Sequence, residues 1–269
     1  MKFHLGTHHP HWLADTRFTD VPLFVSHRQL TRYKALPRAV GAWACDSGGF
    51  TELSIHGRWT LSPQDYTRAL KRYADEIGGL AWASPQDWMC EPQMLAATGL
   101  TVDEHQRRTV ESVMELRALG APVIPVLQGW SFGEYLQCIE LYDRAHLDLR
   151  AEPVVGVGTI CRRQMMTSAL VTLGHLLWEG LRLHPFGFKA TGLRGVFNLG
   201  YHLENERGGR VVSSDSLAWS YNARRERPLP ECRGRHKNCA NCPRWALSWR
   251  DALLGSLDCG PQLSLAGVA

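Results

Sequence analysis

Two aspartates far apart in the chain, Asp46 and Asp215, each close a short apolar run that predicts a buried strand. A pair of carboxylates at one site suits glycosidic chemistry, because one can attack the anomeric carbon while the other carries the leaving group's proton. The two carboxyls can take these different roles only if their environments give them different pKa values. A structural aspartate at a strand end is the competing interpretation of each residue.

Polar or glycine-rich segments follow several apolar runs and could hold a flat ring. Asp87 could accept hydrogen bonds from ring N–H groups, and the Gln128 amide both donates and accepts. Adjacent glycines let a ligand approach the backbone, and Phe50 has a face for stacking. Taken alone, each residue is explained equally well by an ordinary turn or helix cap. Together they predict a binding site that contains Ser47, Gly48, Gly49, Phe50, Asp87, Gln128, Gly129, Gly156 and Gly158.

A cluster of thiols near the C-terminus has the spacing of a metal site. Cys239 and Cys242 form a Cys-x2-Cys pair that lets two thiolates face one ion, and Cys232 with His236 can complete a tetrahedron. Cys259 competes with His236 as the fourth ligand. Four protein ligands leave no position for water, so we predict a structural zinc ion.

The elements that must position these residues alternate between strands and helices. This alternation predicts a parallel sheet, and the number of strands suggests a closed (β/α)8 TIM barrel. An open doubly wound sheet is the alternative. The predicted strands are Lys2 to Gly6, Val21 to Ser26, Ala42 to Asp46, Leu80 to Ser84, Val123 to Gln128, Val154 to Thr159, His184 to Lys189 and Val211 to Asp215.

Helix caps occur between these runs. Ser62 before a proline predicts one helix start, and Thr101 and Ser131, each with a glutamate three residues later, predict capping boxes. Residues 164–181 form an apolar helix. We expect a catalytic barrel over residues 1–221 and a zinc module with a C-terminal helix over residues 222–269.

Composition restricts the class of protein. With 44% hydrophobic and 21% charged residues among 269, the chain is of ordinary globular type, which excludes a disordered, collagen-like or coiled-coil chain. It has no apolar stretch long enough to span a bilayer, and no apolar core of a secretory signal follows Met1, so we expect a cytoplasmic protein without a membrane partner.

The charge is concentrated in one segment. Residues 222–250 contain eight basic and two acidic side chains, a net charge of +6 in a chain whose total is +4. Such a patch indicates a polyanionic partner, although a solvated basic surface explains the charge equally well.

The run Asp46-Ser47-Gly48-Gly49-Phe50 resembles the signature of the tRNA-guanine transglycosylase superfamily, whose (β/α)8 enzymes exchange guanine for a 7-deazaguanine. The order of the later pieces is also similar: an aspartate after the next strand, Gln-Gly, a glycine-rich strand end, a late aspartate and a cysteine-rich zinc cluster. The similarity spans roughly residues 40–245 and is most specific at residues 46–50.

The resemblance implies a mechanism. Asp215 would be the nucleophile that attacks C1′ and forms a covalent intermediate, and Asp46 would be the general acid/base. The implied substrates are a nucleic acid and a free 7-deazaguanine base. The residues implied in stacking on the base, bonding to its edge and contacting its exocyclic groups are Phe50, Asp87, Gln128, Gly156 and Gly158.

The chain departs from the superfamily pattern in several places. Thr51 replaces the usual Gln, Trp130 replaces a Gly, the first two cysteines are farther apart, and the late histidine ligand is absent, which is why His236 is assigned to the zinc site. We also expect no separate RNA-binding domain. The chain is therefore more similar to the compact branch that installs preQ0-type bases in DNA, where the target nucleotide must leave the base stack.

Three alternatives stay open. The first is base exchange in tRNA, and the second is a zinc-dependent nucleic-acid-binding protein without catalysis. The third is a glycosylase in which water replaces the incoming base. The sequence also leaves the oligomeric state open, a homodimer included.

Overall fold

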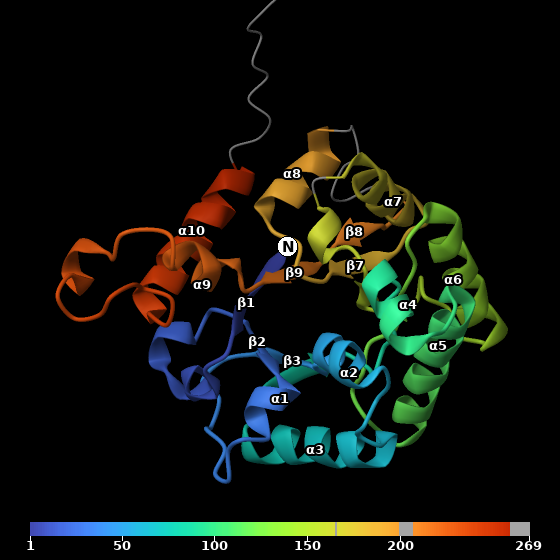
Figure 1. Cartoon of the computed structure of the whole chain (residues 1–269), viewed down its shortest axis with the longest axis horizontal. Helices are drawn as coiled ribbons and strands as arrows, with labels where there is room; N and C mark the ends of the chain where they lie inside the picture. Colours follow the sequence, from blue (N-terminus) through green and yellow to red (C-terminus); the bar gives the residue numbers. More distant parts are fainter. Residues whose placement is uncertain (165, 199–206, 259–269) are drawn as a thin grey trace, which may run out of the picture.

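The computed structural model describes residues 1–164, 166–198 and 207–258, so Cys259 lies outside the described residues. Within them the strands form two parallel sheets (Figure 1). The first sheet has the order β4-β3-β2-β1-β9, and the second has the order β5-β6-β7-β8. The strands are β1 (Lys2–Thr7), β2 (Leu23–Ser26), β3 (Trp43–Asp46), β4 (Leu80–Ala83), β5 (Val126–Leu127), β6 (Val155–Val157), β7 (Arg182–Pro185), β8 (Arg210–Val211) and β9 (Ser213–Ser216).

Backbone contacts join the two sheets at both of their edges. At one edge, Ala83 after β4 makes a parallel bridge to Val123, just before β5. At the other edge, Val212 separates β8 from β9, accepts a bond from the N–H of Lys2 at 2.9 Å and donates one to the carbonyl of Leu183 at 3.0 Å. The predicted α/β class with parallel strands is confirmed, and the closed barrel stays a prediction.

Helices surround the strands in Figure 1, with α3, α5, α6, α7, α8 and α10 on the outside. In the described residues, no helix combines the length and apolar character that crossing a bilayer requires. The helices are α1 (His27–Leu30), α2 (Gly49–His56), α3 (Pro63–Glu76), α4 (Pro92–Thr98), α5 (Val102–Ala118), α6 (Phe132–Arg144), α7 (Thr167–Trp178), α8 (Ala190–Asn198), α9 (Ala218–Ala223) and α10 (Pro243–Asp258).

The predicted helix caps are present, with one difference. Ser62 Oγ accepts the N–H of Asp65 at 3.1 Å, which begins α3. Ser131 and Glu134 make the complete capping box of α6. At α5, Thr101 accepts the N–H of Glu104, but the Glu104 carboxylate bonds to arginines one turn further along the helix instead of to the cap. The sequence therefore predicted the start of α5 correctly. The reciprocal bond of a capping box, from the Glu104 side chain to the backbone of Thr101, was predicted wrongly.

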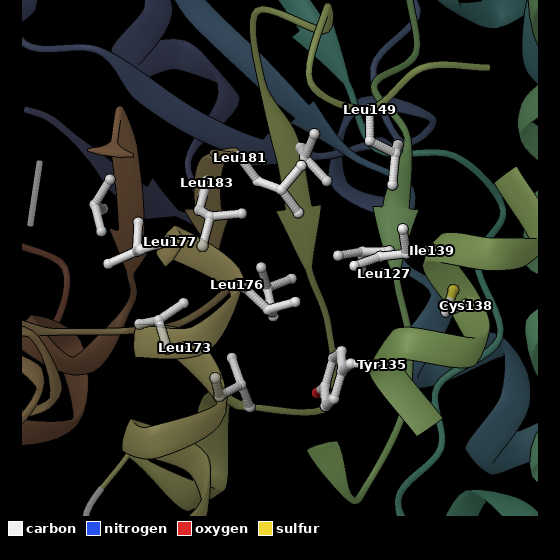
Figure 2. Close-up of a cluster of buried hydrophobic side chains, with 14 of the residues drawn as sticks. Leu127, Tyr135, Cys138, Ile139, Leu149, Leu173, Leu176, Leu177, Leu181 and Leu183 are labelled. Carbon is white, nitrogen blue, oxygen red and sulfur yellow. The ribbon is translucent and has the colours of Figure 1, made fainter. Parts of the chain in front are cut away.

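The apolar faces of β5, β6, β7, α6 and α7 form one core cluster, which includes Leu127, Tyr135, Leu173 and Leu183 (Figure 2). A second cluster joins β1 to β3 with α3 and includes Trp43 and Trp219. Burial of this apolar surface is the main force that holds helices against the sheets.

Three predicted strands differ from the structure. Of the run Val123 to Gln128, only Val126–Leu127 form a strand, β5. The run His184 to Lys189 was placed too late at both ends, because β7 is Arg182–Pro185. Beyond its end, Gly187 leaves the extended conformation with φ of 65°. The run Val211 to Asp215 is divided at Val212, since β8 pairs with β7 whereas β9 pairs with β1. The apolar helix is also shorter than residues 164–181, as α7 begins at Thr167.

Candidate functional site

A pocket of about 820 Å³ opens where several strands end, and it brings the predicted acids together. Asp46 is the last residue of β3, Asp215 lies in β9, and Asp87 follows β4. All three line the pocket with Gly49, Phe50 and Gly158. The carboxyl ends of parallel strands meet at one edge, which explains how residues so distant in sequence share one cavity.

Asp46 has an environment that favours its protonated form. Burial raises the pKa of this carboxyl, and the negative charge of Asp215 raises it further. Hydrogen bonds from the backbone of Gly48 and the hydroxyl of Ser26 oppose that shift without cancelling it. A carboxyl that can hold a proton and release it beside a second carboxylate is suited to general acid/base work.

Asp215 is held by two donors on one of its oxygens. The N–H of Gly187 donates to Oδ1 at 2.8 Å, and His184 Nε2 lies 3.2 Å from the same atom. The other ring nitrogen, Nδ1, lies 2.8 Å from Ser213 Oγ, and the ring is fully buried. Both the Nε2–H tautomer and the protonated ring donate to Asp215. Among the described residues no hydrogen bond engages Oδ2, which leaves that oxygen for a ligand.

A chain of side-chain bonds runs along another wall of the pocket. Gln128 Nε2 donates to Asp87 Oδ2 at 2.5 Å, while Gln128 Oε1 accepts the hydroxyl of Thr159 at 2.6 Å. Thr159 also faces Glu91 Oε2 at 3.3 Å, and its φ of 54° is unusual for a β-branched residue. Burial, and then the charge of Asp46, raise the pKa of Asp87 to about 7. Burial also raises the pKa of Glu91.

Two glycines, Gly156 within β6 and Gly158 just after it, make room for neighbouring side chains. A Cβ on Gly158 would lie 2.2 Å from Gln128 Nε2, so this glycine is what allows the amide to cross the strand end. A Cβ on Gly156 would lie 2.7 Å from the ring of Phe186, which lines the pocket. The Gly-x-Gly sequence therefore supports both the amide that orients Asp87 and an aromatic ring at the pocket wall.

The four predicted metal ligands also lie together. One ligand atom from each of Cys232, His236, Cys239 and Cys242 lies within 4.8 Å of the others. The Sγ atoms of Cys232 and Cys242 are 3.8 Å apart, and two thiolates on a tetrahedral zinc ion are separated by about 3.8 Å. His236 Nε2 is 3.2 Å from Cys239 Sγ. These four residues lie close enough to bind a metal ion such as zinc.

The comparisons with known proteins identify a family. The family described as DeoxyPurine in DNA protein A (DpdA) matches residues 1–264. The chain belongs to the DpdA family. A search of curated proteins gives no match. Membership in the DpdA family supports the resemblance to the compact DNA branch of the transglycosylases.

The predicted site residues of this DpdA-family chain divide into two groups. The residues that line the pocket are Asp46, Gly49, Phe50, Asp87, Gly158 and Asp215. Those that are buried and do not line the pocket are Ser47, Gly48, Gln128, Gly129 and Gly156. Gln128 is fully buried and contacts Asp87.

Sequence reasoning missed several residues of the site. His184 contacts Asp215, and the N–H of Gly187 donates to the same carboxylate. Glu91, Thr159 and Phe186 line the pocket. A polar residue within the apolar run that ends at Pro185 was the one available signal for His184, because a buried imidazole needs polar partners.

Proposed function

We propose that this protein exchanges guanine for a 7-deazaguanine base of the preQ0 type in DNA through a covalent aspartyl intermediate. The observation that carries the proposal is the presence of Asp46, Asp87 and Asp215 on the lining of one pocket. DpdA-family membership favours DNA over tRNA, because the family's description concerns deoxypurines in DNA. We also propose that the two sheets form one closed barrel, on the support of the bonds at Val123 and Val212.

In the first half of the reaction, Asp215 acts as the nucleophile. Its Oδ2 attacks C1′ of the extruded deoxyguanosine while the C1′–N9 bond breaks and the electron pair leaves with guanine. Protonated Asp46 gives its proton to the departing base, which the raised pKa of this carboxyl supports. Oδ1 becomes the ester carbonyl and keeps its bonds from Gly187 and His184.

The second half reverses these roles. Ionised Asp46 removes the N9 proton of the incoming 7-deazaguanine, and N9 attacks C1′. The Asp215 carboxylate is the leaving group, and the donors Gly187 N–H and His184 Nε2–H stabilise the returning negative charge. Two inversions retain the configuration at C1′. Water in place of the base would give an abasic site.

The pocket also has the groups that hold a flat purine. Phe50 and Phe186 both line it and offer aromatic faces. Asp87 can accept from the N1–H and amino group of guanine, which requires its ionised form. The bond from Gln128 to Asp87 Oδ2 stabilises that form against burial, so we assign Gln128 an orienting role at the base edge.

We assign the Cys/His cluster a structural zinc ion. Zinc bound by three thiolates and one imidazole is fully occupied by protein and supplies folding free energy. The cluster follows α9, which itself follows the strand of Asp215. We therefore propose a barrel over residues 1–221 and a zinc module over residues 222–269, with the boundary inside α9 (Ala218–Ala223).

Trapping the intermediate tests the proposal. Full-length protein is incubated with guanine-containing single-stranded DNA, duplex DNA or tRNA and then denatured, and the adduct is mapped by mass spectrometry. We expect an adduct on Asp215 with DNA, and incorporation of labelled preQ0 into the same DNA. Asp215→Asn should form no adduct, whereas Asp75→Asn at an exposed helical site should behave as wild type.

Each contrary result identifies an alternative. Label that enters only tRNA would overturn the choice of DNA. Abasic sites in place of exchanged bases would indicate a glycosylase, and binding without an adduct or exchange would indicate a non-catalytic protein. An Asp215→Asn variant that still exchanges the base would remove Asp215 from the nucleophile's role.

A further inference from the structure

An exposed aromatic ring lies at the rim of the pocket. Tyr221, in α9, lines the pocket and leaves 52% of its surface exposed. The guanidinium of Arg225 lies 4.0 Å from the centre of its ring. A large ring that the core does not bury, beside a cavity, is available to a ligand. An arginine against one face of the ring restricts its motion and adds positive charge.

The surroundings of Tyr221 are basic and continue to the pocket. Arg224, Arg225 and Arg227 are exposed on the segment that follows α9, with Glu226 among them. On the pocket lining, Arg162 and Lys189 add two more cationic side chains. A chain of phosphates that leaves the pocket past Tyr221 would therefore meet complementary charge.

We propose that Tyr221, held by Arg225, is a stacking platform for the nucleobase next to the target nucleotide, so that the enzyme takes its DNA as a locally unpaired strand. A base inside a duplex has both faces covered by its neighbours and cannot stack on a protein ring. Stacking on an aromatic side chain stabilises a single-stranded base by about 1–3 kcal/mol. The inference rests on the proposed function only in that the target base enters the pocket of Asp46 and Asp215.

The chain contains a matched control for this ring. Trp178 is 53% exposed and has the guanidinium of Arg207 at 4.6 Å from its ring, but it does not line the pocket. Any general effect of removing an exposed, arginine-covered aromatic ring should therefore appear in Trp178→Ala as well. An effect that depends on the place of Tyr221 at the pocket should appear only in Tyr221→Ala.

Binding of short DNA tests the platform. All variants carry Asp215→Asn, so that binding is reversible, and Kd is measured by fluorescence anisotropy with a labelled single strand of about 13 nucleotides that contains one central guanine. We expect Tyr221→Ala to weaken binding about 10-fold. Tyr221→Phe and Trp178→Ala should each stay within about twofold of the parent.

Strands with an abasic site beside the guanine separate stacking from charge. Removing the stacked base should weaken binding to the parent protein and leave Tyr221→Ala nearly unaffected, since that variant has lost the contact already. An equal effect of Tyr221→Ala on intact and abasic strands would overturn the platform, and so would parent-like affinity of Tyr221→Ala for the intact strand. A fully paired duplex bound as tightly as the single strand, with the same Tyr221 dependence, would overturn the unpaired state.

A different measurement, base exchange by the wild-type protein, tests the proposed function. Loss of base exchange by wild-type protein on every nucleic acid would refute the chemistry and leave the anisotropy result intact. Normal exchange combined with no effect of Tyr221→Ala would refute the platform alone.

Discussion

The Cys/His cluster and the acid pocket are built in opposite ways. The cluster takes its four ligands from eleven successive residues, whereas the pocket takes its acids from β3, the loop after β4, and β9. The cluster can therefore assemble with little loop closure, but the pocket requires several strands to pair first. A site built from neighbouring residues, such as the cluster, can be predicted from their spacing in the sequence. A site built from several strands, such as the pocket, depends on the fold.

The two regions also treat their ionisable groups differently. In the pocket, burial raises the pKa of Asp46, Asp87 and Glu91, so each carboxyl is held in an environment that opposes its charge. In the cluster, a bound cation would neutralise the thiolates. Burial therefore costs stability at these carboxyls, as expected of the catalytic site that we propose, whereas a metal ion bound in the cluster would add stability.

The regions are nevertheless connected through α9 and the core. The indole N–H of Trp219 donates to the carbonyl of Gly6 at 2.8 Å, and Trp245 donates to the carbonyl of Trp219 at 3.2 Å. Gly6 lines the pocket. Damage to the cluster should therefore reach the pocket mouth, while damage to the pocket acids should leave the cluster unchanged.

The largest expected effect comes from loss of the metal. Cys239→Ser removes one thiolate, and since zinc binding supplies about 10–16 kcal/mol in small zinc peptides, the cluster should lose its order. Metal analysis should fall from about one zinc per chain to near zero, and the Tm should fall. If His236→Ala retained zinc and Cys239→Ser did not, the fourth ligand would be another residue, such as Cys259.

Asp46→Asn should lower turnover about 10²- to 10⁴-fold, because an amide cannot carry the proton between the bases. Incorporation of labelled 7-deazaguanine into DNA measures the effect, and zinc content should stay as in wild type. The exposed Asp75→Asn variant is the control. Turnover within a few-fold of wild type would show that another group transfers the proton.

His184→Leu should lower kcat about 10- to 100-fold, because it removes one donor to Asp215 Oδ1. The KM for the free base should change little, since the imidazole is buried behind the carboxylate. His184→Gln, whose amide can donate to the same oxygen, should recover part of the rate. An equal loss of kcat in both variants, accompanied by a lower Tm, would indicate that His184 has a packing role.

The smallest effect concerns Asp87 and pH. Its pKa is raised from 3.8 to about 7, so the folded protein keeps a proton that the unfolded chain loses, and stability falls as the pH rises between those values. Asp87→Asn should remove this fall and raise the Tm at pH 8 by a few degrees, roughly 2–4 °C for each kcal/mol. Thermal scans at pH 5 and pH 8 measure it. An unchanged difference between the two scans would contradict the proposed burial penalty.

Local sequence signals predicted much of the fold. The caps at Ser62 and Ser131 were correct because a hydroxyl that accepts a backbone N–H acts within one turn. The apolar runs located the parallel strands, but the end of β7 was placed too late because the turn at Gly187 has no distinctive local pattern. The helices α2 and α4, within the loops after β3 and β4, were not predicted.

For the site, the sequence by itself brought out the four candidate metal ligands, because spacing within a few residues fixes which side chains can meet. It offered Asp46, Asp87 and Asp215 as candidates only from their places after apolar runs. The tertiary structure alone decided that Asp46, Asp87 and Asp215 share one cavity, that Gln128 lies behind Asp87, and that His184 contacts Asp215. These contacts join residues from different strands, and their distances depend on strand register and burial. Burial also sets the pKa of each acid, which no local pattern in the sequence reports.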